Sequence, residues 1–290
     1  MTMRARGIIA GYDGSAGSAE AIDWAVREAR LRGVPLSVCH AWTCGYATPK
    51  ADAADVAMPL ERGSAVDPAR EHAREVLDLG VQRAQACDPA VTARPLLVCH
   101  PAARALCEQS AGADMLVVGA RGAGGLAGLL LGSVSLQAAA HAVAPVTVVR
   151  GRWRPGLGYD PRPVVVGTDG SPGARAPLAF ALEAAALRDV PLVAVCALSD
   201  AAGVLGIARN VEADFNAATG KAQADHPEVL VQKRVEQGAP RSALLAVASQ
   251  SQLLVVGARG RGGLPDMMLG SVSFAVLHHA PCPVTVVHGA

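Results

Sequence analysis

The chain has 290 residues, of which 51% are hydrophobic and 18% are charged. This length is typical of about two domains, and this composition excludes a disordered chain. The 26 basic and 25 acidic residues nearly cancel, so there is no broad electrostatic reason to bind nucleic acid or an anionic membrane. We therefore expect neither as a partner.

The seven cysteines predict free thiols in a reducing compartment. Their number is odd, no Cys-x-x-Cys pair occurs, and three of them lie in apolar runs. The arginines near the N-terminus are not followed by the apolar core of a signal peptide. The longest apolar stretch, 126–149, contains a glutamine, a histidine and a proline, which fits a helix followed by a strand. We therefore expect a cytoplasmic protein.

Short β-branched runs alternate with helical patterns along the whole chain. The strands predicted in the first half are 7–12, 35–40, 91–98, 115–119 and 146–150, and the helices are 18–31, 68–86, 102–111 and 133–142. The strands predicted in the second half are 164–168, 192–197, 228–235, 253–257 and 284–288. This alternation predicts parallel strands with right-handed crossovers. Apolar runs such as MLVVG predict strands that helices cover on both faces.

The sequence contains an internal duplication. RGIIAGYDGSAG at 6–17 corresponds to RPVVVGTDGSPG at 162–173, with an offset of 156 residues. VVGARGAGGLAGLLLGSVS at 117–135 corresponds to VVGARGRGGLPDMMLGSVS at 255–273, with an offset of 138 residues. The first copy therefore holds 18 additional residues (156 minus 138), which we place within 43–66.

Repeats of this length predict two whole domains rather than a solenoid. We place the first domain at 1–151 and the second at 163–290. The segment 152–162 is rich in proline and arginine and is predicted to be the linker.

The most informative motif is Gly-x-x-Gly, nine residues, then Gly-Ser, at 119–133 and again at 257–271. Each motif leaves the carboxyl end of a fourth strand and enters a fourth helix, where ligands bind in open α/β sheets. Backbone N–H groups in such a loop and at the helix N-terminus can hold a di- or triphosphate. Alternatively, the glycines form tight turns and the serine caps its helix. Because both copies keep the full spacing, we favour the phosphate cradle.

Asp13 and Asp169 follow the first strand of each copy, at the neighbouring strand end. Each carboxylate can accept a hydrogen bond from a ribose hydroxyl or an adenine amine, or it can bond the backbone of its own turn. Both interpretations stay open. Gly11 and Gly167, two residues earlier, would let a nucleotide approach the backbone. The glycines do not form Gly-x-Gly-x-x-Gly, which disfavours NAD, and no P-loop motif occurs.

Three further positions differ in what they indicate. Arg121 and Arg259 recur in the glycine loops, where each either pairs with phosphate or lies in solvent. His141 and its counterpart lie near the end of the fourth helix, where a histidine interacts favourably with the helix C-terminus. His40 is replaced by Cys196 in the second copy, so no chemistry shared by the copies can depend on it.

Together these features resemble the universal stress protein family, in its ATP-binding subgroup, with two family domains in tandem. The resemblance covers essentially the whole chain and rests on the glycine-serine motif and the strand-one aspartate, each present twice. It implies two α/β domains of the adenine-nucleotide α-hydrolase-like (Rossmann-like) type. Each would have five parallel strands in the order 3-2-1-4-5, with helices on both faces.

The resemblance also implies a ligand, ATP with or without Mg²⁺, and the residues that hold it. In the first domain these are Gly11, Asp13, Ala41, Gly119, Ala120, Arg121, Gly122, Ala123, Gly124, Gly125, Gly132, Ser133 and Val134. In the second they are Gly167, Asp169, Ala197, Gly257, Ala258, Arg259, Gly260, Arg261, Gly262, Gly263, Gly270, Ser271 and Val272. No residue is assigned as catalytic or as a metal ligand.

Two classes of function follow from this. One is a regulatory ATP-binding protein of the stress response, and the other is an enzyme, either a slow ATPase or a transferase that uses an adenylate. No lysine or second carboxylate recurs beside the motif, which favours the regulatory protein. A flavin or NAD carrier using the same cleft is a weaker alternative.

The fifth strand of each copy is an apolar sheet edge, with the sequence VTVV at 146–149 and 284–287. Unpaired edges of this kind are templates for pairing. We predict that the two strands pair antiparallel about a pseudo-twofold axis, as an intramolecular pseudo-dimer that leaves any homodimer to other surfaces. The alternative is that each edge is covered by its own chain or linker.

Overall fold

The computed structural model describes residues 7–43, 67–124, 130–151, 153, 158–198, 208–260 and 268–289. The first half contains strands β1 (Ile8–Gly11), β2 (Leu36–Trp42), β3 (Ala93–Cys99), β4 (Met115–Gly119) and β5 (Val146–Val149). Its helices are α1 (Ala16–Arg32), α2 (Pro68–Cys87), α3 (Ala102–Ser110) and α4 (Ser133–His141). Nearly all of the segment to which the 18 additional residues were assigned lies outside the described residues, as does part of the predicted linker.

The second half repeats this order of elements. Its strands are β6 (Val164–Gly167), β7 (Leu192–Leu198), β8 (Val231–Gln237), β9 (Leu253–Gly257) and β10 (Val284–Val287). Its helices are the 3-10 turn η1 (Pro172–Ala174), α5 (Arg175–Ala186), α7 (Ala208–Gln223), α8 (Pro240–Ala248) and α9 (Ser271–His279).

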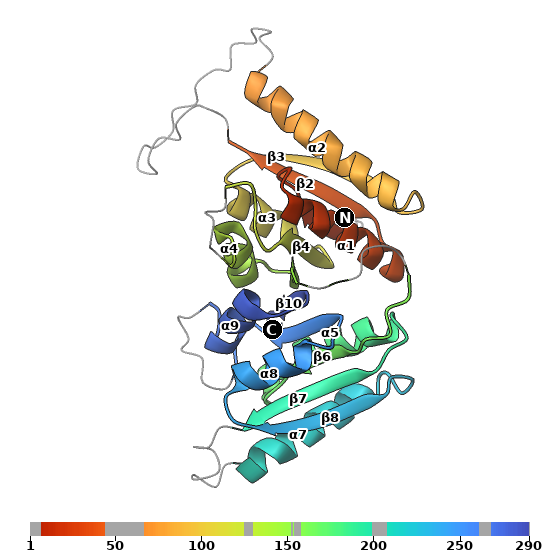
Figure 1. Ribbon diagram of the computed structural model, residues 1–290, viewed down its shortest axis with the longest axis vertical. Helices are drawn as coiled ribbons and strands as arrows, with labels where there is room; N and C mark the ends of the chain where they lie inside the picture. Colours follow the sequence, from red (N-terminus) through yellow and green to blue (C-terminus); the bar gives the residue numbers. More distant parts are fainter. Residues whose placement is uncertain are drawn as a thin grey trace.

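All ten strands join in one sheet, in the order β3-β2-β1-β4-β5-β10-β9-β6-β7-β8 (Figure 1). Within each half every pairing is parallel, and the order is the 3-2-1-4-5 that the resemblance implies. The predicted α/β class, the strand order and all ten predicted strands are therefore confirmed.

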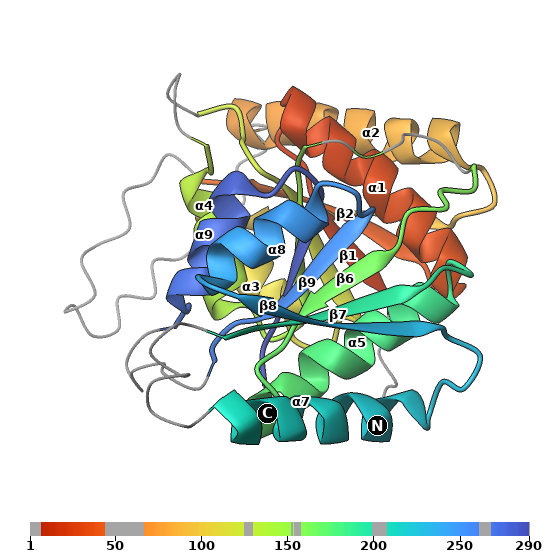
Figure 2. The same ribbon diagram turned by 60° about the horizontal axis from the view of Figure 1, so that its bottom comes forward.

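Helices cover both faces of this sheet, as Figure 2 shows. One core includes residues of α1, α2, α5 and α7, and the other includes residues of α3, α4, α8 and α9. Successive strand residues face opposite cores, so Ile8 belongs to the first and Ile9 to the second. β4 is buried at every position, as its uninterrupted apolar sequence predicts. Among the helices described, none is long and apolar enough to span a membrane.

Two strands begin two or three residues later than the sequence pattern predicts. β3 was expected from residue 91 and β8 from 228, but Val91 and Val229 lie in turns that precede the strands. Their N–H groups donate to the carbonyls of Asp88 and His226 at 3.2 and 3.1 Å. Both valines are buried, so the apolar character that indicated a strand serves core packing from a turn.

β5 and β10 pair antiparallel and join the halves, which confirms the predicted pairing of the fifth strands. Thr147 lies directly opposite Thr285, and their fully buried hydroxyl oxygens are 2.8 Å apart. The two threonines are equivalent positions in the duplication, since 147 plus 138 is 285. The pseudo-twofold axis therefore passes between them.

Two contacts related by this axis connect α4 and α9 to the opposite halves. Arg150 donates to the carbonyl oxygen of Leu277 in α9. His288, at the position equivalent to Arg150, has its Nε2 atom 3.0 Å from the carbonyl oxygen of Ala139 in α4. Figures 1 and 2 both place α4 and α9 beside each other. The side chains at two equivalent positions, an arginine and a histidine, thus make equivalent contacts with the opposite half.

A buried ion cluster joins the halves on the other face of the sheet. Glu28 of α1 accepts hydrogen bonds from Arg32, at 2.6 Å, and from Arg188 of the second half. Arg32 also pairs with Glu183 of α5 at 3.0 Å, and its guanidinium lies 5.2 Å from the centre of the Phe180 ring. Burial raises the pKa of Glu28, but the two arginines outweigh this effect and hold that pKa below its ordinary value.

Candidate functional site

Two cavities of the same size, about 380 Å³ each, open at the carboxyl ends of the strands. The expected residues that line the first are Gly11, Asp13, Ala41, Gly119, Arg121, Gly122, Gly124, Gly132, Ser133 and Val134. Those that line the second are Gly167, Asp169, Ala197, Gly257, Arg259, Gly260, Gly270, Ser271 and Val272. The fold therefore brings most of the residues singled out in the sequence together, once in each half.

The remaining expected residues fall into two groups. Ala120, Ala123 and Ala258 lie in the described loops but do not line the cavities. Gly125, Arg261, Gly262 and Gly263 lie outside the described residues.

Asp13 holds the first glycine loop against the end of β1. One carboxylate oxygen accepts hydrogen bonds from the N–H and hydroxyl of Ser15, at 3.1 and 2.6 Å. The other accepts from the N–H of Ala123, at 2.8 Å. Partial burial raises the pKa of Asp13, but the hydrogen bonds from Ser15, Ala123 and Ser18 outweigh it and lower that pKa. Asp13 is therefore a carboxylate near neutral pH, and it makes the local turn contact that the sequence left open.

The glycine loop lies so close to its neighbours that a side chain at two of its glycines would overlap them. A Cβ at Gly122 would overlap the carboxylate of Asp13, and one at Gly119 would overlap the backbone of Gly17 in α1. In contrast, a Cβ at Gly124 would meet no described atom within 4 Å. The loop thus needs glycine to reach Asp13, and at Gly124 it faces open space.

The N-terminus of α4 forms the wall next to this loop. Gly132 is the N-cap, and no side chain caps the helix, so Ser133 does not act as the cap that the alternative interpretation required. The N–H of Gly132 donates to the carbonyl of Ala120 at 2.7 Å. Ser133 and Val134 line the cavity, where the unpaired donors and the positive end of the helix dipole favour an anion.

A serine that the sequence analysis missed fixes the angle between the loop and this helix. The hydroxyl of Ser135 donates to the carbonyl of Gly119 at 2.6 Å. Ser273 makes the same bond to Gly257, also at 2.6 Å. The recurrence of Gly-Ser-Val-Ser in both copies was the available signal.

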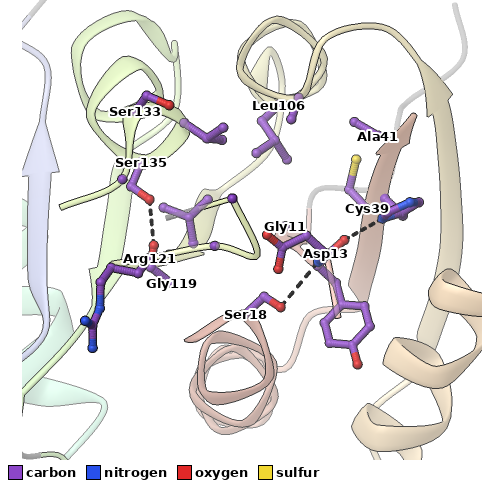
Figure 3. A pocket seen from close by; sticks show the side chains of 18 residues that line it. Gly11, Asp13, Ser18, Cys39, Ala41, Leu106, Gly119, Arg121, Ser133 and Ser135 are labelled. Atoms are coloured by element: carbon purple, nitrogen blue, oxygen red, sulfur yellow. Dashed lines mark hydrogen bonds between the residues drawn. The ribbon is translucent and has the colours of Figure 1, made fainter. Parts of the chain in front are cut away.

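One arginine of each glycine loop, Arg121 or Arg259, lines the cavity of its half. Figure 3 shows the guanidinium of Arg121 extending away from Asp13 and Ser133. Arg121 lies near a second arginine, Arg150. Burial lowers the pKa of Arg150, and the positive charge of Arg121 lowers it further. Contact between Arg121 and a phosphate remains a prediction that requires this side chain to turn inward.

The part of each cavity away from the helix N-terminus is apolar. In the first, Cys39, Leu106 and Val118 form its walls, and in Figure 3 Ala41 lies at the end of β2 beside them. A Cβ at Gly11 would lie 3.1 Å from Leu106, so the glycine allows α3 to pack close to β1. Burial raises the pKa of Cys39 to about 12, so this thiol is a neutral wall atom at neutral pH.

The second cavity has the same plan with different side chains at its apolar end. Val195 and Leu244 occupy the positions of Cys39 and Leu106, and Thr168 replaces Tyr12. The N–H of Ser171 donates to the Asp169 carboxylate at 2.9 Å, which matches the bond from Ser15 to Asp13.

No cluster of three or more histidine, cysteine or acidic side chains that could hold a metal ion occurs in the described part of the chain. The six described cysteines are all free thiols. The cavities therefore combine one carboxylate, a glycine loop, a helix N-terminus and an apolar end.

A model of the universal stress protein family matches residues 5–150 and 161–288. The chain belongs to this family. A universal stress protein of Mycolicibacterium smegmatis is 35% identical over 298 residues, which cover 97% of this chain and 96% of that protein. A universal stress protein of Mycobacterium tuberculosis is 36% identical over 292 residues, with the same coverage of both chains.

A solved structure agrees with this assignment at the level of the fold. The crystal structure of a universal stress protein from Archaeoglobus fulgidus superposes with a TM-score of 0.67, at 21% identity. The superposition covers 98% of this chain and 99% of the Archaeoglobus chain. The family and the tandem arrangement that the resemblance implied are thus confirmed for this universal stress protein.

Proposed function

We propose that this universal stress protein binds an adenine nucleotide, ATP, in each of its two domains and acts as a regulatory protein of the stress response. The observation that carries the proposal is the duplicated cavity, in which the same parts meet in the same order. A volume of about 380 Å³ lies within the range of about 300–1,000 Å³ typical of small-molecule sites.

The chemistry of each wall suits one part of the nucleotide. The glycine loop and the first turn of α4 offer N–H donors to the phosphates. Asp13 already accepts three hydrogen bonds, and as a carboxylate it keeps acceptor capacity for a ribose hydroxyl. The apolar walls formed by Leu106 and Val118 suit the adenine ring, next to the backbone of Ala41.

A Mg²⁺ ion would enter with the nucleotide. Mg²⁺ is usually held by one or two carboxylates together with substrate phosphates and water. Among the described residues, Asp13 and Asp169 are the carboxylates that line the two cavities, so phosphate oxygens would provide most of the ligands.

The same inventory favours regulation over catalysis. Phosphoryl transfer needs a group that positions the attacking water and a charged clamp on the transferred phosphate. The described residues that line both cavities include one carboxylate and one arginine each, and no lysine. We therefore propose that nucleotide occupancy, rather than turnover, is the signal, and that the protein responds to it in the cytoplasm.

The test is to identify the small molecules that the purified protein retains. Protein purified without added nucleotide is denatured, and the released compounds are measured by mass spectrometry. The proposal predicts ATP or its hydrolysis product ADP, and loss of both from a Gly122→Val/Gly260→Val variant. Release of a flavin or NAD instead, or failure of the emptied protein to bind added ATP, would refute it.

A further inference from the structure

One difference between the two cavities is a histidine at the apolar end of the first. His40 of β2 lines the first cavity and is half-buried. Its equivalent in β7, Cys196, is fully buried and does not line the second cavity. The duplication has therefore kept the phosphate end of both cavities and changed this position.

The ring of His40 is held in one orientation. Its Nδ1 atom lies 2.8 Å from the backbone carbonyl oxygen of Tyr12. Because a carbonyl can only accept, Nδ1 must carry the proton, and in the neutral ring Nε2 is then a hydrogen-bond acceptor. Among the residues that the structure describes, Tyr12 is the one hydrogen-bond partner of His40, and Nε2 has none.

The carbonyl that orients His40 is itself fixed. The N–H of Tyr12 donates to the carbonyl of Cys39 at 2.9 Å. The Tyr12 ring packs against α2 at Gly80, where a Cβ would lie 2.6 Å from the ring. The imidazole is thus placed in advance of binding, which limits the ordering cost that a mobile side chain would add.

The position of His40 along β2 indicates which part of the ligand lies nearest to it. Figure 3 places Ala41 and Cys39, the neighbours of His40 in β2, on the side of Asp13 opposite Ser133 and the start of α4. A ligand whose phosphates lie at α4 therefore presents its nucleoside to β2. A nucleoside has two kinds of hydrogen-bond donor, the exocyclic amine of its base and the hydroxyls of its ribose.

On the basis of the proposed function, we infer that His40 is a specificity-determining residue of the first site. Its Nε2 accepts a hydrogen bond from the nucleoside, a bond that the second site cannot make. The two sites are therefore unequal, and the first discriminates more strongly against nucleotides that lack the donor.

The test compares affinities by titration calorimetry in a chain with only the first site, made by Gly260→Val. His40→Cys, which installs the residue of the second copy, should weaken ATP binding about two- to tenfold, the effect of one hydrogen bond. His72→Cys, a change at an exposed histidine on α2 outside both cavities, is the matched control and should bind as the parent does. If Gly260→Val does not fold, the same pair is compared in the unaltered chain with a two-site fit.

Nucleotide analogues then identify the donor. Purine riboside triphosphate lacks the amine, and 2′-deoxy-ATP and 3′-deoxy-ATP each lack one hydroxyl. One of these analogues should bind the protein that keeps His40 as weakly as ATP binds the His40→Cys variant. The affinity of that analogue should not fall further when His40 is replaced by cysteine. Unchanged ATP affinity in His40→Cys would overturn the inference, and so would a loss that no analogue reproduces, because His40 would then act only by holding Tyr12. Failure of the parent protein to bind ATP at all would refute the proposed function itself.

Discussion

Replacing Glu28 by alanine should destabilise the protein by about 3–5 kcal/mol, the usual cost of removing one partner of a buried ion pair. Glu28 has a side chain that is 1% exposed, and Arg188 and Arg32, its partners, are 5% and 8% exposed. Alanine would leave Arg188 buried in the interface between the halves without the one carboxylate that it pairs with among the described residues. Arg32 would be affected less, because it keeps Glu183 at 3.0 Å.

Calorimetry of the full chain measures this loss. At about 2 °C per kcal/mol for a chain of this size, the melting temperature should fall by about 6–10 °C. Glu108→Ala, which breaks an Arg–Glu pair of the same i,i+4 spacing on the exposed face of α3, is the matched control and should leave the transition unchanged. A double variant, Glu28→Leu/Arg188→Leu, should be less destabilised than Glu28→Leu alone because it removes both charges.

The pH dependence has a definite sign. The pKa of Glu28 is lower in the folded than in the unfolded chain, so its contribution is complete above the ordinary value of 4.5 and disappears as the pH falls through the folded value. The difference in stability between the parent and Glu28→Gln should therefore shrink in acid. If Glu28→Ala melts no earlier than Glu108→Ala, the cluster does not hold the halves together as described.

Three further outcomes are expected. Thr147→Val should lower the free energy of unfolding in urea by about 1–3 kcal/mol, because it leaves the buried hydroxyl of Thr285 without its partner. The double variant Thr147→Val/Thr285→Val should be nearly neutral, and equal losses in both would argue against the pairing. Burial raises the pKa of Cys39 to about 12 and that of Cys282 to about 11. At pH 8 a thiol reagent should therefore label the exposed Cys99 in the native protein, and it should label Cys39 and Cys282 only after unfolding, as peptide mass spectrometry would measure. Rapid native labelling of Cys39 would show that the wall of the first cavity opens. ATP hydrolysis by the purified protein should run far below the common enzyme value of about 10 s⁻¹, and a rate near that value would reveal a catalytic group missing from the description of the site.

The strands and the site plan could be predicted because they depend on local patterns that the duplication displays twice. The apolar runs MLVVG and LLVVG predicted β4 and β9 with the correct first and last residues. Short apolar runs of this kind are typical of strands that are buried on both faces. The glycine spacing indicated where the loop and α4 meet. The apolar edge of β5 predicted its partner, because an exposed edge of that kind requires one.

What the sequence did not reveal depends on contacts between distant residues. Glu28 and Arg188 are 160 positions apart, and nothing near either residue shows that the other will neutralise it. The reach of Asp13 to the N–H of Ala123 spans 110 positions and becomes visible only when β1 and β4 lie side by side. His40 was set aside because the second copy lacks it, and yet it lines the first cavity and has no counterpart in the lining of the second.

The central claim is that one chain holds two adenine-nucleotide sites of the same design. Titration calorimetry of nucleotide-free protein with Mg-ATP tests it most directly, using Gly122→Val and Gly260→Val singly and together. A Cβ at Gly122 would overlap the Asp13 carboxylate, and one at Gly260 would lie 3.2 Å from the carboxylate of Asp169. We predict close to two ATP per chain for the parent, one for each single variant and none for the double variant, with all four proteins folded by circular dichroism. Unchanged affinity and stoichiometry in the double variant would contradict the account.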